Sequence, residues 1–398
     1  MATGTPSFDV LVIGSRASGL AAAVSAERAG AQVALATKAS LQANNSSKAQ
    51  GGIQAAFGED DSPERHAEDI FRSSHDTADM SLVEVLTGDA QSAIKWLEEL
   101  GVEFTREDDG YRLARCGGAT AKRLLQVGDR TGHAITKGLR EAWEASSGTS
   151  FLNAPLRELT QSNGHWRAHV GEHDVETGTV ILAAGGRCYA EAEKRGELST
   201  NHPNATGEVT QIAVGLGAES RDLDALQYHP NGGAWPPNMQ GYSIPETTRA
   251  YGAVLLNADG EEFTDSLGPR DVVSEAIFDE VAKGRGVETP DGRPAVYLDT
   301  TRIDVADAEI SLPYMLRRYR GSGIDPLKER ILTYPVLHYQ NGGLVIDTRA
   351  ETTLDGVYAC GEIAGGTHGR NRMMGNSLLE CVVFGRRAGK AASEKARS

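Results

Sequence analysis

The chain lacks long apolar runs and has few cysteines. No apolar run among its 398 residues approaches the roughly 18 needed for a membrane helix, so the sequence does not imply a membrane span. Four scattered cysteines, Cys116, Cys188, Cys360 and Cys381, form no Cys-x-x-Cys pair, so we predict no metal site. Such thiols suit a reducing cytoplasm, and the opening MATGTPSFD has no basic segment before an apolar core. We therefore expect a cytoplasmic protein without an export signal.

Basic residues are also scarce. Lys and Arg number 40 against 55 Asp and Glu, which gives a net charge of −15. This charge argues against nucleic acid or an anionic membrane surface as a partner. An anionic substrate must therefore be held by a local positive cluster. With 39% hydrophobic and 24% charged residues, and without repeats or low-complexity segments, the chain is typical of a globular protein large enough for two domains.

The most informative stretch is FDVLVIGSRASGLAAAVSAERAGAQVALATK. Asp9–Ile13 has the β-branched composition of a buried strand, Gly14–Gly19 is a turn of small residues, Leu20–Ala29 favours a helix, and Ala31–Thr37 favours a second strand. A helix that begins at such a turn directs free backbone N–H groups at the turn. The usual ligand there is a dinucleotide pyrophosphate.

The glycine fingerprint G-x-G-x-x-G is incomplete in this turn. Gly14 and Gly19 match, but Arg16 stands in place of the middle glycine, which normally allows close backbone approach to the pyrophosphate. Two interpretations remain open: the Arg16 side chain pairs with phosphate, or the site is weakened. Taken alone, the stretch is also compatible with an ordinary strand–helix–strand unit.

The remaining pattern predicts a mixed α/β chain. Ser62 caps a helix that starts at Pro63, and two amphipathic helices follow as far as Leu100. A hairpin over 101–113, a helix over 132–145 and a helix over 376–396 are expected. Strands are predicted over 151–153, 166–170 and 175–183, and the last of these ends in glycines, as a strand does beneath a cofactor. The proline-rich segment from 226 to about 337 indicates a second domain inserted into the first.

An ordered set of motifs then identifies a family. FDVLVIGSxASGL, KAQGGIQAAFGEDDSPERHAED, GDRTGHAI, VILAAGG, QYHP, GPRDVVSEAI, HYQNGG and YACGE…HGRNRMMGNSLLECVVFG resemble the FAD-dependent flavoproteins that comprise L-aspartate oxidases, fumarate reductases and succinate dehydrogenases. The resemblance covers nearly the whole chain in the right order. GEDDSPERHAED and NSLLEC are most similar to the aspartate oxidases, whereas GDRTGHAI and GRRAG are more similar to the other branch.

The resemblance implies a fold and a cofactor. The fold is α/β, with a Rossmann-like FAD-binding domain formed from residues 1–225 and 341–398 and an inserted α+β capping domain at 226–340. Asn45 stands where succinate dehydrogenases carry the histidine that bonds covalently to the flavin. Since asparagine cannot form that bond, we predict non-covalent FAD.

The resemblance also implies catalytic residues. His229, His338 and Arg372 match groups that hold the carboxylates of a small dicarboxylate, and the planar fork of arginine suits this role. Arg270 matches the proton-transfer arginine, and Glu246 matches its relay carboxylate. Each residue taken singly also has a structural interpretation, as a loop residue, a solvated charge or a helix-start ion pair. The five together indicate the site.

The expected FAD ligands come from both ends of the chain. The polar loop after the second strand has residues suited to lie against a flat polar ring, Glu362 suits a hydrogen bond to ribityl or ribose hydroxyls, and the last helix directs N–H groups at the flavin N1–C2=O edge. The predicted set is Gly14, Ser15, Ser18, Gly19, Thr37, Lys38, Ser46, Ser47, Gln50, Gly51, Gly52, Ala184, Gly185, Glu362, Asn376, Ser377 and Leu378.

Several positions depart from the family pattern. Cys116 replaces a glutamate that aspartate oxidases use for the substrate ammonium, Pro245 replaces a substrate-contacting threonine, and Thr206–Val209 reads TGEV rather than TGDG. We expect an L-aspartate oxidase-like enzyme that forms iminoaspartate, with fumarate reductase or succinate dehydrogenase chemistry as the alternative. Oxygen, quinone or fumarate is the expected electron acceptor. A flavoprotein without catalysis is the alternative of another class, and a nicotinamide enzyme is disfavoured because there is no second fingerprint.

Overall fold

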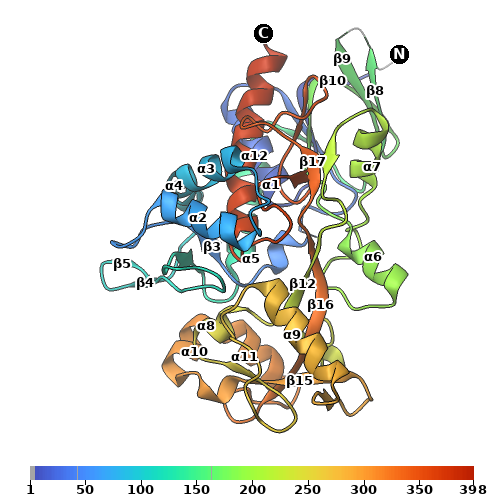
Figure 1. Ribbon diagram of the computed structural model, residues 1–398. Helices are drawn as coiled ribbons and strands as arrows, with labels where there is room; N and C mark the ends of the chain where they lie inside the picture. The colour runs from blue at the N-terminus through green and yellow to red at the C-terminus, as the bar shows by residue number, and fades with distance from the viewer. Residues whose placement is uncertain (1–4, 43, 163) are drawn as a thin grey trace.

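A parallel sheet formed by both ends of the chain is the centre of the fold (Figure 1). The computed structural model describes residues 5–42, 44–162 and 164–398. Strand β1 (Ser7–Ile13) lies between β2 (Val33–Ala36) and β10 (His173–Leu182), and β18 (Val357–Ala359) also pairs with β10 in parallel. The predicted first strand is confirmed, since apolar residues that are buried on both faces of a parallel sheet read as a continuous run.

The sheet extends further on both sides. On one side β7 (Thr149–Phe151) pairs with β2, and on the other side β9 (His165–Val170) and β8 (Leu156–Ser162) continue as antiparallel strands. The strand expected over 151–153 is wrong in its bounds, because pairing with β2 ends at Phe151. Strand β8 was not predicted, since its sequence LRELTQS is too polar to indicate a strand.

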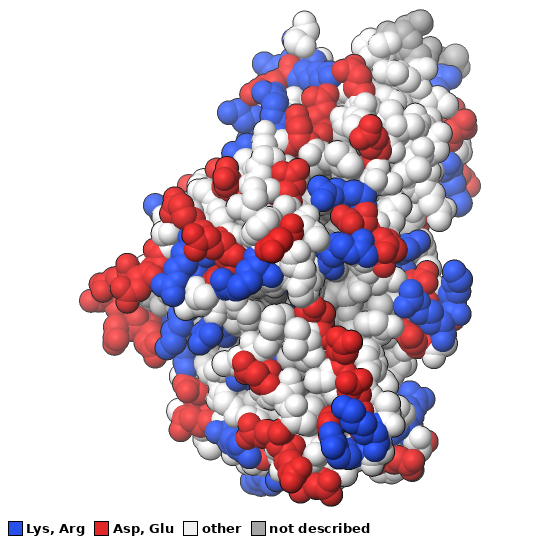
Figure 2. Space-filling view, in the orientation of Figure 1, with Lys and Arg blue, Asp and Glu red and all other residues white. Residues whose placement is uncertain are grey.

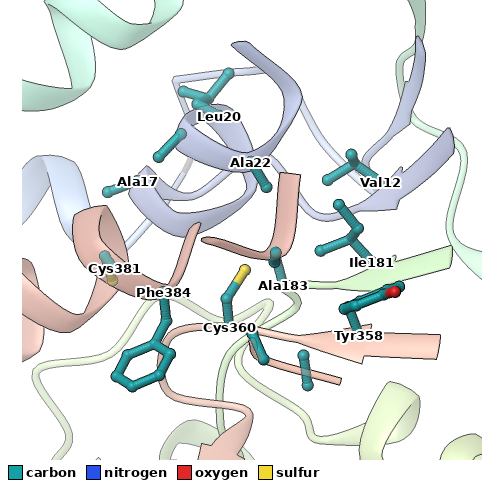
Figure 3. Close-up of a cluster of buried hydrophobic side chains, with 14 of the residues drawn as sticks. Val12, Ala17, Leu20, Ala22, Ile181, Ala183, Tyr358, Cys360, Cys381 and Phe384 are labelled. Atoms are coloured by element: carbon teal, nitrogen blue, oxygen red, sulfur yellow. The ribbon is translucent and has the colours of Figure 1, made fainter. Parts of the chain in front are cut away.

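Helix α1 (Ala17–Arg28) packs against the long C-terminal helix α12 (Asn376–Ala396). Gly385 and Gly389 permit the close approach, because a Cβ atom at either position would lie within 2.7 Å of a backbone oxygen of α1. Figure 3 shows Leu20 and Ala22 of α1 in the same apolar cluster as Phe384 of α12. The main core therefore joins the first and last thirds of the chain. The predicted helix is three residues longer at its start, at Ala17 instead of Leu20.

Helices α2 (Pro63–Ser73), α3 (Met80–Gly88), α4 (Ala90–Glu99) and α5 (Thr131–Glu144) cover one flank. The predicted cap of α2 is confirmed, because Ser62 accepts a hydrogen bond from the Arg65 N–H at 3.2 Å. The predicted hairpin is present as β4 (Arg106–Glu107) and β5 (Gly110–Tyr111). Acidic side chains gather at this hairpin, whereas the rest of the visible face mixes both signs of charge (Figure 2).

The segment from 226 to 340 forms a second lobe with its own apolar core (Figure 1). Two long antiparallel strands, β12 (Leu226–Gly233) and β16 (Ile331–Gln340), lead into it. Its other elements are β13 (Val254–Leu256), β14 (Val287–Glu288), β15 (Pro294–Asp299), α8 (Thr247–Ala250), α9 (Arg270–Ala282), α10 (Val305–Ser311) and α11 (Pro313–Arg320). The exact domain boundaries at 226 and 340 stay predictions.

The remaining elements are short. They are η1 (Ser46–Lys48), β3 (Ile53–Gln54), β6 (Leu124–Leu125), α6 (Cys188–Arg195), α7 (Glu208–Gly215), β11 (Ser220–Arg221), η2 (Pro237–Met239), η3 (Thr300–Arg302), β17 (Gly343–Val345) and β19 (Ala364–Gly365). Within the described residues, none of the helices has the length and apolar character to traverse a bilayer.

Candidate active site

Two histidines from neighbouring strands face one another at the junction of the lobes. His229 lies on β12 and His338 on β16, and because these strands pair, the two rings meet edge to face with centroids 5.0 Å apart. Both side chains line the same cavity as Arg270 and Arg372. The fold therefore brings together four cationic or donor groups from segments that are far apart in sequence.

Both histidines are held neutral. Burial, followed by the charge of Arg270, lowers the pKa of His229 and of His338 well below the usual value. The Asn231 N–H donates to His229 Nδ1 at 2.9 Å, so the proton of a neutral His229 is on Nε2. Thr200 Oγ1 lies 2.6 Å from His338 Nδ1 and fixes the orientation of that ring. Neutral imidazoles oriented in this way can donate to a carboxylate without titrating near pH 7.

Arg270 is the first residue of α9, and a buried carboxylate fixes its position. Its Nε donates to Glu246 Oε2 at 2.6 Å, and Arg249 Nη2 lies 3.5 Å from the same oxygen. Burial alone would raise the pKa of Glu246, but Arg270 and then Arg249 outweigh burial and lower it. Glu246 is therefore an anion at neutral pH. Because Glu246 binds the Nε atom of Arg270, the two Nη groups of this arginine remain available for other partners.

Gln227 links the two arginines of the cavity. Its Oε1 accepts from Arg270 Nη1 and from Arg372 Nη2, both at 3.2 Å. The Arg372 guanidinium also lies 4.3 Å from the centre of the Tyr339 ring and donates from Nη1 to Ser377 Oγ at 3.0 Å. Burial, followed by Arg270, lowers the pKa of Arg372 to about 10, so it stays charged at neutral pH. Its planar fork is thus preset for a carboxylate.

The expected local positive cluster therefore exists inside an acidic protein. Arg249 and Arg270 pair with the Glu246 carboxylate, and Arg372 and two neutral histidines line the same cavity as Arg270. Five of these side chains are at most 6% exposed, and His338 is partly buried. Since buried charges interact far more strongly than exposed ones, this cavity favours an anion with two acidic ends over a cation or a neutral molecule.

Most predicted FAD-binding residues line two adjoining cavities, although their roles stay predictions. The cavity that holds the arginines also contains Ser18, Ser46, Gln50, Gly51, Gly52, Gly185, Glu362, Ser377 and Leu378. The second cavity contains Gly14, Ser15, Thr37, Lys38 and Ala184. Three predicted residues line neither. Gly19 packs against the Gly14 carbonyl, Ser47 faces a neighbouring cleft, and the Asn376 side chain turns to His66.

These cavities fit FAD by several local features. Gly51 and Gly52 form a wall without side chains, and a Cβ atom at Gly51 would meet the Met374 sulfur at 2.9 Å. The first turns of α1 and α12 border the cavities, and N–H groups at a helix start suit a pyrophosphate and a flavin carbonyl. Asn45 lies in the first cavity, where its amide contacts Asn201 and the His202 N–H. A non-covalent flavin is compatible with that residue.

Two predicted FAD-binding residues also contact other residues of the protein. The Glu362 carboxylate, expected to meet sugar hydroxyls, accepts from Arg16 Nη1 and from the Gln340 N–H, both at 3.1 Å. Lys38 pairs with Glu208 at 2.5 Å, and Glu208 is the residue that departs from the TGDG pattern. Glu362 is therefore paired with a cation of the dinucleotide-binding turn, and Glu208 is paired with a cation just after the second strand.

Sequence reasoning missed several residues of the site. Gln227 lies two positions before His229 in QYHP, and Tyr339 follows His338, so both stand inside motifs that were identified. Arg249 lies one helical turn after Glu246, a spacing that indicates an ion pair. Thr200 and Asn201 had no local signal. Their contacts with His338 come from a loop more than 130 residues earlier in the chain.

Cys116 lies behind the cavity rather than in it. The thiol is 2% exposed, accepts from Gln54 Nε2 at 3.3 Å and points to the Met374 carbonyl at 3.7 Å. Burial, followed by the charge of Glu246, raises its pKa to about 12, so it is neutral. The carboxylate that aspartate oxidases are expected to carry here has no substitute at this position.

The sheet formed from two chain ends, the inserted lobe and the pair of cavities define a dinucleotide-binding flavoprotein. The chain belongs to the FAD binding domain family, whose model matches residues 9–378. The predicted fold class, family and cofactor are thereby confirmed, and the protein is an FAD-dependent oxidoreductase.

Named relatives come from both expected branches. The chain is 33% identical to a fumarate reductase (CoM/CoB) of Methanothermobacter marburgensis, over 98% of this chain and 73% of that one. It is 34% identical to L-aspartate oxidase of Streptomyces coelicolor, over 95% and 67%. Among solved structures, quinol fumarate reductase FrdA of E. coli superposes with a TM-score of 0.90 at 28% identity, over 99% of this chain and 71% of that chain.

Proposed function

We propose that the protein oxidises or reduces a small dicarboxylate. The observation that carries this proposal is the convergence of His229, His338, Arg270 and Arg372 on one cavity whose two carboxylates are both paired with arginines. Relatives named fumarate reductase and L-aspartate oxidase act, by their names, on substrates of this kind. A four-carbon dicarboxylate offers two charged ends to these groups.

The chain's own residues would bind and orient the substrate. Arg372, held by Tyr339 and Gln227, receives one carboxylate, and the Nε2 proton of His229 together with His338 receives the other. Binding both carboxylates would fix the distance between the substrate carbons and the flavin ring. Such positioning lowers the barrier of the reaction by several kcal/mol, about 7 or more at best. Bound FAD supplies the partner that accepts or gives the hydride.

Arg270 would move the proton. Arg270 lines the cavity while its Nε is bonded to Glu246. In the reducing direction an Nη group would give its proton to the substrate carbon, and the neutral guanidine left behind would take a proton from solvent by way of the Glu246 carboxylate. Arginine is a weak acid in water, but a dry site with an adjacent anion makes the exchange feasible. Arg249 holds Glu246 from its other side and keeps it charged.

The substrate within this class is the second part of the proposal. Motif similarity favours L-aspartate, as the sequence predicts. The geometry around Cys116 favours succinate or fumarate, because a neutral thiol outside the cavity cannot pair with a substrate ammonium. The two carboxylates that line the cavity, Glu246 and Glu362, are already paired with arginines, so neither replaces the missing partner of an ammonium. The geometry therefore supports the unsubstituted dicarboxylate over the amino acid.

Anaerobic mixing of the FAD-loaded protein tests both parts. The flavin absorbance band is followed after addition of succinate or L-aspartate, and after addition of fumarate to the reduced protein. Reoxidation by fumarate without bleaching by L-aspartate supports the geometric argument, whereas bleaching by L-aspartate supports the aspartate oxidase prediction. If none of the three changes the band, the protein binds flavin without dicarboxylate catalysis.

A further inference from the structure

Arg16 lies where the two FAD cavities meet. It is the residue before the first turn of α1, and it lines both the cavity with the arginines and the cavity beside β1 and β2. A dinucleotide that fills both cavities must pass this residue, since its two halves are joined through the pyrophosphate. The side chain that replaces the middle fingerprint glycine thus stands at the place where the negative charge of FAD is concentrated.

Neighbouring residues fix the position of the Arg16 guanidinium. Its Nη1 donates to Glu362 at 3.1 Å, and the two side chains are 12% and 9% exposed. It also lies against Gly185, where a Cβ atom would come within 2.0 Å of Nη1. A glycine at the end of β10 and a carboxylate beyond β18 therefore hold the guanidinium in one place. An arginine that extended into solvent would need neither a glycine beside it nor a buried carboxylate partner.

The guanidinium has donors to spare. In the part of the chain that the structure describes, its one hydrogen bond is the contact with Glu362, which leaves most of its five N–H groups available. Lys48 is close enough for the charge of Arg16, after burial, to lower its pKa. Lys38, on the far side of the turn, is paired with Glu208. Arg16 is therefore a largely buried cation at the junction of the two cavities, with donors free for an anion.

We propose that Arg16 binds the pyrophosphate of FAD with its side chain, and that Glu362 positions it for this contact. The Arg16 guanidinium would replace the close contact between backbone and pyrophosphate that the middle glycine allows in proteins with the complete fingerprint. The binding site is thus kept rather than weakened by the substitution. This inference rests on FAD as the cofactor and is independent of the substrate proposed above.

The expected effect is on FAD retention. A hydrogen bond between charged groups contributes enough that its loss should speed FAD release by about 10- to 100-fold. Because the contact is electrostatic, salt should weaken it. Raising ionic strength should therefore speed FAD release from the wild-type protein more than from a variant without the charge.

The test uses the FAD-loaded protein and the rise in flavin fluorescence after dilution. Arg16→Lys retains a charge and Arg16→Gln has similar length without one. We expect release in the order wild type, Arg16→Lys, Arg16→Gln, from slowest to fastest, with a reduced salt dependence only in Arg16→Gln. Arg293→Ala, an exposed arginine of the second lobe, serves as a control and should match wild type.

Two results would overturn the inference. Equal release from Arg16→Lys and Arg16→Gln would show that the charge is not what holds FAD. Slower release from Arg16→Gln than from wild type would show that the guanidinium obstructs the dinucleotide. Glu362→Gln separates positioning from general damage: it should speed release by less than Arg16→Gln and retain the salt dependence.

Discussion

The Nε atom of Arg270 donates to Glu246 Oε2 at 2.6 Å, although the two residues come from different segments of the second lobe. Both side chains are at most 6% exposed, and Arg249 lies on the other side of the same carboxylate. One anion therefore compensates two buried guanidinium groups. The position of the proposed proton donor depends on this relationship, and the stability of the lobe depends on it too.

Replacing Glu246 should cost both stability and activity. Glu246→Gln leaves two buried arginines without their anion, and breaking a buried ion pair lowers the free energy of unfolding by about 3–5 kcal/mol. The pKa of Glu246 is lowered in the folded protein, so its contribution is present above its unfolded pKa and is lost as pH falls through the folded value. Urea unfolding at pH 7 and at successively lower pH should show the free energies of unfolding of the two proteins converge as Glu246 becomes protonated.

The matched control for this change is Glu309→Gln. Glu309 pairs with Arg320 on the surface of the same lobe, where such pairs contribute about 0–1 kcal/mol. A loss of stability as large in Glu309→Gln as in Glu246→Gln would show that burial of the pair is irrelevant.

The ring of Tyr339 should contribute to dicarboxylate binding. Tyr339→Leu removes the aromatic face 4.3 Å from the Arg372 guanidinium, and a desolvated cation–π contact corresponds to a roughly 2- to 30-fold loss of affinity. Tyr339→Phe retains the ring and loses only the contact of the hydroxyl with Glu380. Titration of the FAD-loaded protein with malonate, followed by the flavin spectrum, measures both. Equal losses would assign the effect to the hydroxyl rather than to the ring.

His66 should make the protein sensitive to mild acid. Its Nε2 lies 2.9 Å from Asn376 Oδ1 at the start of α12, and burial followed by Arg123 lowers its pKa to about 4. A histidine with a lowered pKa contributes stability that is complete above its unfolded pKa near 6.5 and is lost as pH falls to 4. The loss is at most about 3 kcal/mol. Urea unfolding of His66→Gln should show a shallower decline over this range; an identical decline would refute the assignment.

The cysteines should be unreactive in the folded protein. All four are buried, and burial raises the pKa of Cys116, Cys360 and Cys381, the first and last to about 12. Because the thiolate is the reactive form, a disulfide reagent that reports thiolate release should detect no thiol under native conditions and four after unfolding. Rapid modification of Cys116 in the native state would place it in the cavity and reopen its role toward substrate.

Local sequence pattern predicted the helices and strands better than it predicted how they pack and pair. The run of apolar residues in β1, the Ser62 cap and the glycines after β10 are local signals, and each lies where predicted. Helix α1 begins earlier than expected because Ser18, a small residue of the turn, packs against Gly385 of α12. Strand β8 has only a weak apolar signal, because Leu156 and Leu159 are its buried apolar residues and the rest of the strand is supported by pairing with β9.

The site residues were predictable through motifs, but their contacts were not. QYHP and HYQNGG identify His229 and His338, yet nothing in either motif shows that their rings meet. The pairing of Arg16 with Glu362 spans 346 positions, a separation at which periodicity carries no information. The partner of a charged residue depends on tertiary structure, which is why the ion pair was not predicted, and the contact of Glu362 with sugar hydroxyls stays a prediction.

The central claim is that Arg270 transfers a proton to a dicarboxylate held over FAD, and single-turnover reoxidation tests it most directly. The FAD-loaded protein is reduced anaerobically and mixed with fumarate while the flavin band is recorded. We predict that wild type is reoxidised and that Arg270→Ala retains FAD but reacts at least about 100-fold more slowly. Reoxidation of Arg270→Ala at the wild-type rate would contradict the account.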